Sequence, residues 1–73
     1  MKPADRYEKI VYWSDEDSCF IGVCPDLFSG GVHGDDPTNV FKELLETVDE
    51  WVKIFDEDGR PLPEPKQRVL QVV

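Results

Sequence analysis

The strongest constraint on the fold is an amphipathic segment at residues 36–55. At about 100° per residue, its apolar side chains fall on one half of a helix and its charged side chains on the other. The apolar set is Val40, Phe41, Leu44, Leu45, Val48, Trp51, Val52, Ile54 and Phe55. Asp36 is a suitable N-cap and Pro37 suits the first helical position. The sequence therefore predicts a helix that lies on an apolar surface formed by the rest of the chain.

The segments on either side of this helix have the pattern of strands and turns. Residues 7–14 and 19–24 are rich in β-branched and aromatic side chains, and a polar turn at 15–18 joins them as a hairpin. A loop at 25–31 leads to a short strand at 32–33. After the helix, the alternating prolines of 59–65 favour extended chain, and 68–73 is expected to form a last strand. Residues 1–6 are expected to fray.

Together these elements predict one domain, residues 1–73, with a two-layer α+β fold. Three antiparallel strands, a helix and a returning strand give a β-β-β-α-β order, with a mixed sheet and the helix on one face. The last strand would pair parallel to the first through a right-handed crossover. Both faces of the strand at 7–14 are partly apolar, so we expect this strand to be central. Because no second helix covers the other sheet face, we expect a homodimer or a higher homo-oligomer.

The charge distribution indicates what kind of partner the surface suits. The chain has 16 acidic and 8 basic residues, a formal charge of −8, and no Lys or Arg between Lys9 and Lys42. Such a surface repels phosphate backbones and favours a basic protein partner, although it is also typical of an ordinary soluble surface. No apolar run approaches the roughly 18 residues that span a bilayer, and we expect a cytoplasmic protein without membrane contact.

None of the reactive side chains forms a recognisable catalytic or metal-binding motif. The run Asp15-Glu16-Asp17-Ser18-Cys19-Phe20 starts like a calcium loop, but Phe20 stands where a glycine is needed. His33 is the only histidine. Cys19 and Cys24 are expected to be reduced, because an odd spacing on one strand places them on opposite faces. We expect neither an enzyme nor a cofactor or metal.

Several motifs, in this order, resemble the HicB-type antitoxin domain over residues 7–73. The matching runs are Cys19-Phe20-Ile21-Gly22-Val23, Pro25-Asp26-Leu27, His33-Gly34-Asp35-Asp36-Pro37 and Asp58-Gly59-Arg60-Pro61-Leu62-Pro63-Glu64-Pro65. The family pattern reads Pro-Asp/Glu-Leu-Pro-Gly-Cys, then Gly-Asp-Thr-Pro, then Gly-x-x-Ile-Pro-x-Pro. This sequence has Phe28-Ser29-Gly30 in place of Pro-Gly-Cys. It also lacks the C-terminal DNA-binding module of many relatives, so we expect no direct nucleic-acid binding.

The resemblance implies a degenerate ribonuclease-H-like fold and a function as an antitoxin. Members of the family bind and mask HicA, a small basic ribonuclease toxin. The expected contact lies on the acidic loops or on an exposed sheet edge. The candidate partner-binding residues are Asp15, Glu16, Asp17, Asp26, Phe28, His33 and Asp35. The alternatives are a solitary homo-oligomeric binding module without a toxin and, third, an enzyme that uses the acidic loops with a divalent metal.

Overall fold

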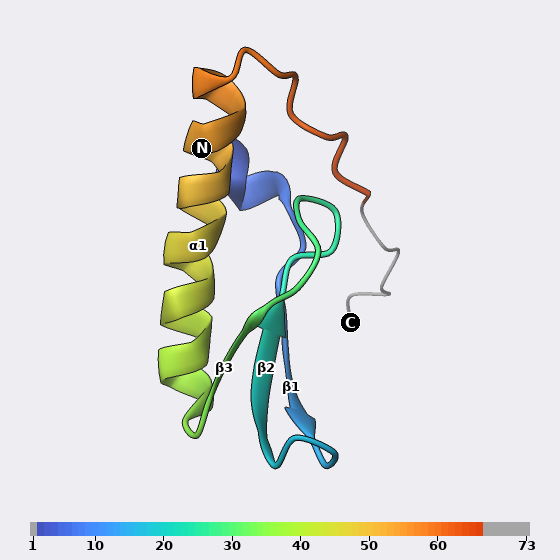
Figure 1. The fold of residues 1–73 in the computed structure, drawn as a ribbon, viewed down its shortest axis with the longest axis vertical. Helices are drawn as coiled ribbons and strands as arrows, with labels where there is room; N and C mark the ends of the chain where they lie inside the picture. Colours follow the sequence, from blue (N-terminus) through green and yellow to red (C-terminus); the bar gives the residue numbers. More distant parts are fainter. Residues whose placement is uncertain (1, 67–73) are drawn as a thin grey trace, which may run out of the picture.

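Among the described residues, one long helix lies against one face of a three-stranded antiparallel sheet, so the fold is α+β, as the sequence predicts (Figure 1). The computed structural model describes residues 2–66. Its elements are the 3-10 helix η1 (Pro3–Arg6), the strands β1 (Ile10–Ser14), β2 (Cys19–Val23) and β3 (Val32–Gly34), and the helix α1 (Pro37–Glu57). The last strand expected at 68–73 lies outside the described residues.

The register of the sheet decides which side chains face the helix. The strand order is β1-β2-β3, so β2 is the middle strand of the described sheet. Val11 lies opposite Gly22, and Gly22 lies opposite Val32, which places these three on one face because directly opposed residues point the same way. That face packs against α1. β1 would be central only if the strand expected at 68–73, which lies outside the described residues, paired with it.

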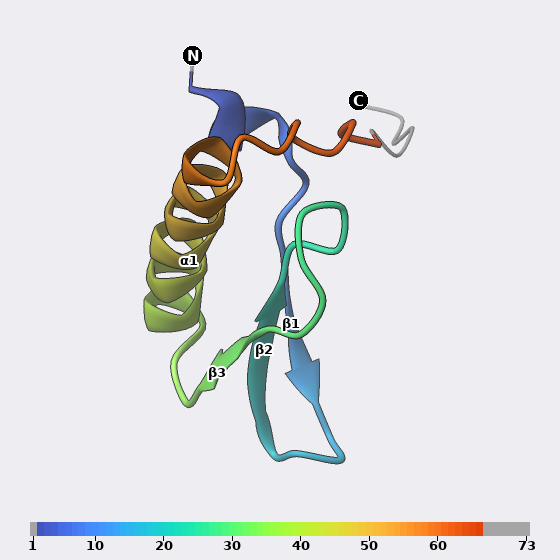
Figure 2. The same cartoon turned by 45° about the horizontal axis from the view of Figure 1, so that its top comes forward.

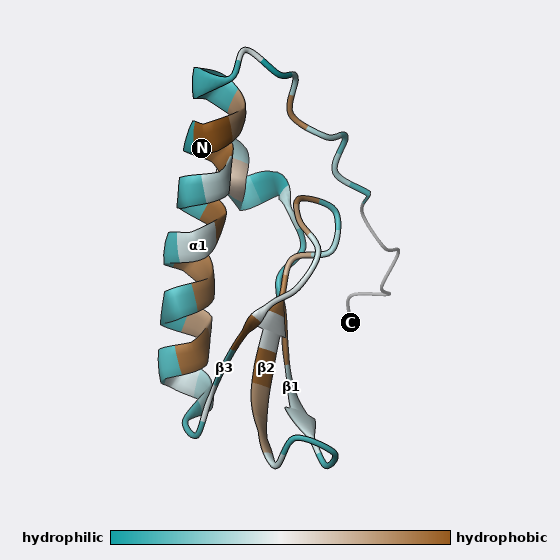
Figure 3. Ribbon diagram, in the orientation of Figure 1, coloured by the Kyte–Doolittle hydropathy of each residue, from teal (hydrophilic) through white to brown (hydrophobic). Residues whose placement is uncertain are grey.

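The helix begins and is capped as its sequence predicts. Asp36 Oδ2 accepts a hydrogen bond from the Asn39 backbone N at 3.1 Å, and Pro37 occupies the first position. Val40, Leu44 and Val48, at successive turns, are buried. Figure 3 shows this apolar side of α1 turned toward the sheet and its hydrophilic side turned outward.

The buried stripe on α1 is narrower than the predicted apolar half. Phe41, Leu45 and Ile54 belong to that half, yet they are 42%, 40% and 39% exposed. A three-stranded sheet covers a limited arc of the helix, so the apolar side chains at both margins of the arc remain in contact with solvent.

The N-terminal segment differs from the expectation that residues 1–6 fray. They include η1, which lies beside the C-terminal half of α1 (Figure 2), and Ala4 is buried. The first strand begins at Ile10 rather than at residue 7. Tyr7 instead fills the core, and its hydroxyl donates a hydrogen bond to the carbonyl of Pro63. This contact ties the start of the chain to the segment that follows α1.

Candidate protein-binding surface

The sheet register gathers four of the predicted acidic residues at one end of the molecule. Asp15, Glu16 and Asp17 form the exposed turn between β1 and β2. Gly34 lies opposite Phe20, near the start of β2, so Asp35 follows at the same end of the sheet. This end is the lower one in Figure 1. We call these four residues the acidic end.

Hydrogen bonds fix two carboxylates of the acidic end. Trp13 Nε1 donates to Asp15 Oδ1 at 2.8 Å, and Ser14 Oγ donates to Asp17 Oδ2 at 3.0 Å. The Asp17 backbone N donates in turn to Ser14 Oγ at 3.2 Å. All these groups are at the surface, so the carboxylates are held in place while they stay accessible.

Asp26 and Phe28 lie at the other end of the sheet, in the loop that follows β2. The ring of Phe28 stacks on Trp51, with centroids 5.6 Å apart and planes at 9°. Asp26 Oδ2 accepts a hydrogen bond from the Lys66 backbone N at 3.1 Å. The structure thus gives both residues contacts within the chain and separates them from the acidic end. A partner contact through them stays a prediction.

His33 lies on the sheet face that is turned away from α1. It is exposed and lies opposite Ile21. With Asp17, Cys19 and Ile21 it borders a shallow hollow of about 360 Å³. Residues 2–66 contain no group of three or more His, Cys, Asp or Glu side chains that could hold a metal ion.

The face that carries His33 is formed by apolar and neutral strand residues, with Asp17 of the turn at its border, and we call it the outer face. Its strand residues are Ile10, Tyr12, Ser14, Cys19, Ile21, Val23 and His33. Within the described strands it carries no Asp, Glu, Lys or Arg, although the chain as a whole is strongly acidic. Tyr12 is 47% exposed near its centre. The outer face therefore differs sharply in chemistry from the acidic end.

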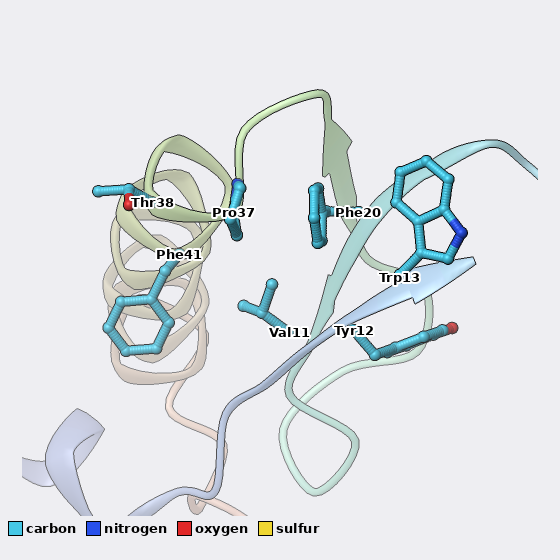
Figure 4. Close-up of a pocket in the computed structure, with 7 residues that line it drawn as sticks. All are labelled: Val11, Tyr12, Trp13, Phe20, Pro37, Thr38 and Phe41. Atoms are coloured by element: carbon cyan, nitrogen blue, oxygen red, sulfur yellow. The ribbon is translucent and has the colours of Figure 1, made fainter. Parts of the chain in front are cut away.

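A groove separates β1 and β2 from the first turns of α1 and has a volume of about 450 Å³ (Figure 4). Its lining residues are Val11, Tyr12, Trp13, Phe20, Pro37, Thr38 and Phe41. Figure 4 shows Val11 and Phe20 pointing from the sheet toward Pro37, with Trp13 beside Phe20 and Tyr12 on the other side of the β1 ribbon. We call this hollow the aromatic groove.

The sequence does not reveal the aromatic groove, because the helical pattern groups Phe41 with the apolar half that is expected to lie on the rest of the chain. Trp13 and Phe20 are directly opposed in the hairpin and pack edge to face, with centroids 5.1 Å apart. Trp13 is 50% exposed and Phe41 is 42% exposed. One feature of the sequence does indicate an exposed apolar surface: the apolar arc of the helix is wider than a single buried stripe requires.

The two side chains with clearly shifted pKa values lie in the core rather than at these surfaces. Burial raises the pKa of the Cys24 thiol, and burial likewise raises the pKa of the Tyr7 hydroxyl. Cys24 is fully buried, and a raised pKa leaves less of the reactive thiolate. Both groups act as parts of the core.

Comparison with known proteins finds no matching family model, curated protein or solved structure. No helix among the described residues is long and apolar enough to cross a membrane.

Proposed function

We propose that this chain is a non-enzymatic, HicB-like binding protein that masks a small basic HicA-like toxin ribonuclease. The observation that carries the proposal is the acidic end, where the register brings Asp15, Glu16, Asp17 and Asp35 together in exposed positions. A concentrated acidic surface attracts a basic protein and orients it during encounter. The motifs that resemble the HicB-type domain supply the identity of that partner.

The chain provides little positive charge near the acidic end. No Lys or Arg occurs between Lys9 and Lys42. Lys9 is engaged elsewhere, because its Nζ donates to the carbonyls of Ala4 and Tyr7. Among the described residues, an ion pair joins Arg60 to Asp58, just past the far end of α1. The carboxylates of the acidic end are thus left for cations from another molecule.

A ribonuclease-H-like β-β-β-α-β fold is part of the same proposal. Three antiparallel strands followed by one helix agree with the first four elements of a ribonuclease-H-like β-β-β-α-β arrangement. The fifth element, a strand within 68–73 beside β1, concerns residues outside the described range.

Co-expression tests the proposal directly. The chain is produced together with a small basic HicA-like protein encoded next to it, and the complex is isolated by affinity purification while growth is recorded. We expect a stable complex that restores growth. Replacing Asp15, Glu16 and Asp17 by Lys should weaken the complex at least about tenfold, because three attractive charges become repulsive.

A matched control separates a local contact from an effect of net charge. Replacing Glu46, Asp49 and Glu50, which are exposed on the outward side of α1, by Lys changes the net charge by the same amount. This variant should still bind. Equal loss in both triple variants would contradict a contact at the acidic end, and the absence of any complex or rescue would overturn the antitoxin function.

The alternative is a solitary HicB-fold module that self-associates and has no toxin partner. The outer face favours it, because two acidic chains can meet through a surface that lacks charge. The oligomeric state of the purified protein tests this alternative.

A further inference from the structure

We propose that the aromatic groove receives an arginine side chain from the basic protein partner, with the guanidinium group directed toward the acidic end. The groove lies between β1 and the first turns of α1, beside the turn that carries Asp15. Because the cation is supplied by a basic protein, the assignment rests on the proposed function.

The lining of the groove suits the stem and the planar head of arginine. Trp13 and Phe41 are half-exposed aromatic rings, and Val11 and Pro37 add apolar surface between them. The aliphatic stem of a long cationic side chain packs on apolar surface, while its head stays near solvent. A guanidinium group also stacks on aromatic faces, and tryptophan is the strongest partner for a cation. An exposed aromatic hollow of this kind favours arginine over a compact lysine ammonium.

The carboxylates around the groove favour a cationic ligand over an anionic one. Trp13 lines the groove and binds Asp15 through its indole N–H at 2.8 Å, which holds this carboxylate next to the aromatic ring. Asp35 and Asp36 immediately precede Pro37 on the opposite wall. Asp36 also caps the helix, so its carboxylate offsets the positive partial charge of the helix N-terminus. Figure 4 shows the indole nitrogen on the side of Trp13 turned away from Phe20, so the carboxylate that it binds lies at the rim of the groove, where it disfavours an acidic ligand.

A second copy of this chain is a poor occupant for the same reason. Its surface is strongly acidic, and like charges placed against Asp15 and Asp35 would repel each other. Self-association is better accommodated by the outer face, whose strand residues within the described range include no Asp, Glu, Lys or Arg. The two surfaces thus suit different partners.

The test uses the full chain, labelled with ¹⁵N, and three blocked peptides. The first is Ac-Gly-Arg-Gly-Arg-Gly-NH₂, the second has citrulline in place of each arginine, and the third has glutamate. Trp13 and Trp51 each contribute one indole N–H resonance, and a Trp13→Phe variant assigns them. We expect the arginine peptide to shift the Trp13 resonance saturably. The citrulline peptide, which has the same shape without the charge, should bind about tenfold more weakly, and the glutamate peptide should not bind.

Two variants locate the site. Phe41→Ala should weaken arginine-peptide binding several-fold, because it removes one aromatic wall. Leu45→Ala is the matched control, since Leu45 is 40% exposed one turn farther along α1 and does not line the groove. It should bind like the original chain. An unshifted Trp13 resonance, equal binding of the citrulline peptide, or unchanged binding by Phe41→Ala would overturn the assignment. A shift that depends on protein concentration without peptide would assign the groove to a second copy instead.

Failure of this assignment can be told apart from failure of the proposed function. A toxin complex that forms equally well with Phe41→Ala would overturn the arginine site and leave the antitoxin function in place. Saturable, charge-dependent peptide binding by a chain that forms no toxin complex would support the arginine site and overturn the antitoxin function.

Discussion

Gly22 is the residue that lets α1 lie close to the sheet. It occupies the middle strand on the face that packs against the helix. A Cβ atom at this position would lie 3.0 Å from Val40 Cγ1 and 3.1 Å from Val32 Cγ2, which is tighter than ordinary van der Waals contact. A glycine inside a strand often marks such a close approach.

Replacing Gly22 by Val should lower the free energy of unfolding by about 1–3 kcal/mol, because the added methyl groups overpack the space beneath Val40. Urea unfolding followed by circular dichroism measures the change. Cys19→Val is the matched control, since it adds bulk to the same strand on the outer face and should change stability by less than about 0.5 kcal/mol. Equal stability of Gly22→Val and the original chain would contradict the close packing of α1 on β2.

The buried Cys24 and Tyr7 predict a loss of stability at alkaline pH. Burial raises the pKa of both groups in the folded chain above their ordinary values of 9.0 and 10.0. As the pH rises above 9, the unfolded chain therefore releases protons that the folded chain retains, so the free energy of unfolding falls. Urea unfolding at successive pH values above and below 9 measures the slope. Cys24→Ala should flatten the first part of the decline, and a stability that stays constant above pH 9 would contradict the prediction.

At the scale of elements, α1 is the part of the fold that the sequence predicts best. The predicted range of 36–55 compares with an observed Pro37–Glu57, and the Asp36 cap is confirmed. Capping and the period of 3.6 are local properties, so they can be recognised without knowing what the helix packs against. Which part of the apolar arc is buried depends on the position of the sheet, so the helical pattern alone does not show that Phe41 stays half-exposed.

The start of the chain was harder to predict because its contacts are distant in sequence. Tyr7 has a high β propensity, but its hydroxyl binds the carbonyl of Pro63, 56 residues away. Tyr7 is accordingly a buried core residue, and β1 begins at Ile10. Local β propensity cannot show whether such a residue lies in a strand or packs in the core before the strand begins.

The sequence predicts the part of the candidate site that lies in the turn of one hairpin. The turn at 15–18 follows from its four polar residues, and the register brings Asp35 beside it. Asp26 and Phe28 were expected on the same binding surface as the acidic turn, yet they follow β2 and therefore lie at the opposite end of the sheet. The aromatic groove depends on how α1 lies across the sheet, which no short sequence pattern specifies.

At the scale of the whole molecule, the charge distribution suits the acidic end and the outer face to the two different kinds of association proposed for this chain. The acidic end attracts cations, and its binding should weaken with salt because exposed charges are screened. The outer face contains apolar and neutral side chains, and association through it should depend little on salt. Ionic strength can therefore distinguish toxin binding from self-association.

Because the outer face is apolar, we predict that the purified chain forms at least a dimer at micromolar concentration. Sedimentation velocity can measure this.

In a twofold symmetric dimer each substitution occurs twice at the same interface. Tyr12→Lys would place two like charges in this apolar contact, so it should shift the protein to the monomer. Leu45→Lys introduces the same charge on the exposed side of α1 and should leave the dimer intact. A monomer for the original chain across this concentration range would contradict self-association through the outer face. A dimer that dissociates in high salt would place the contact among charged residues instead, because an uncharged interface gives salt nothing to screen.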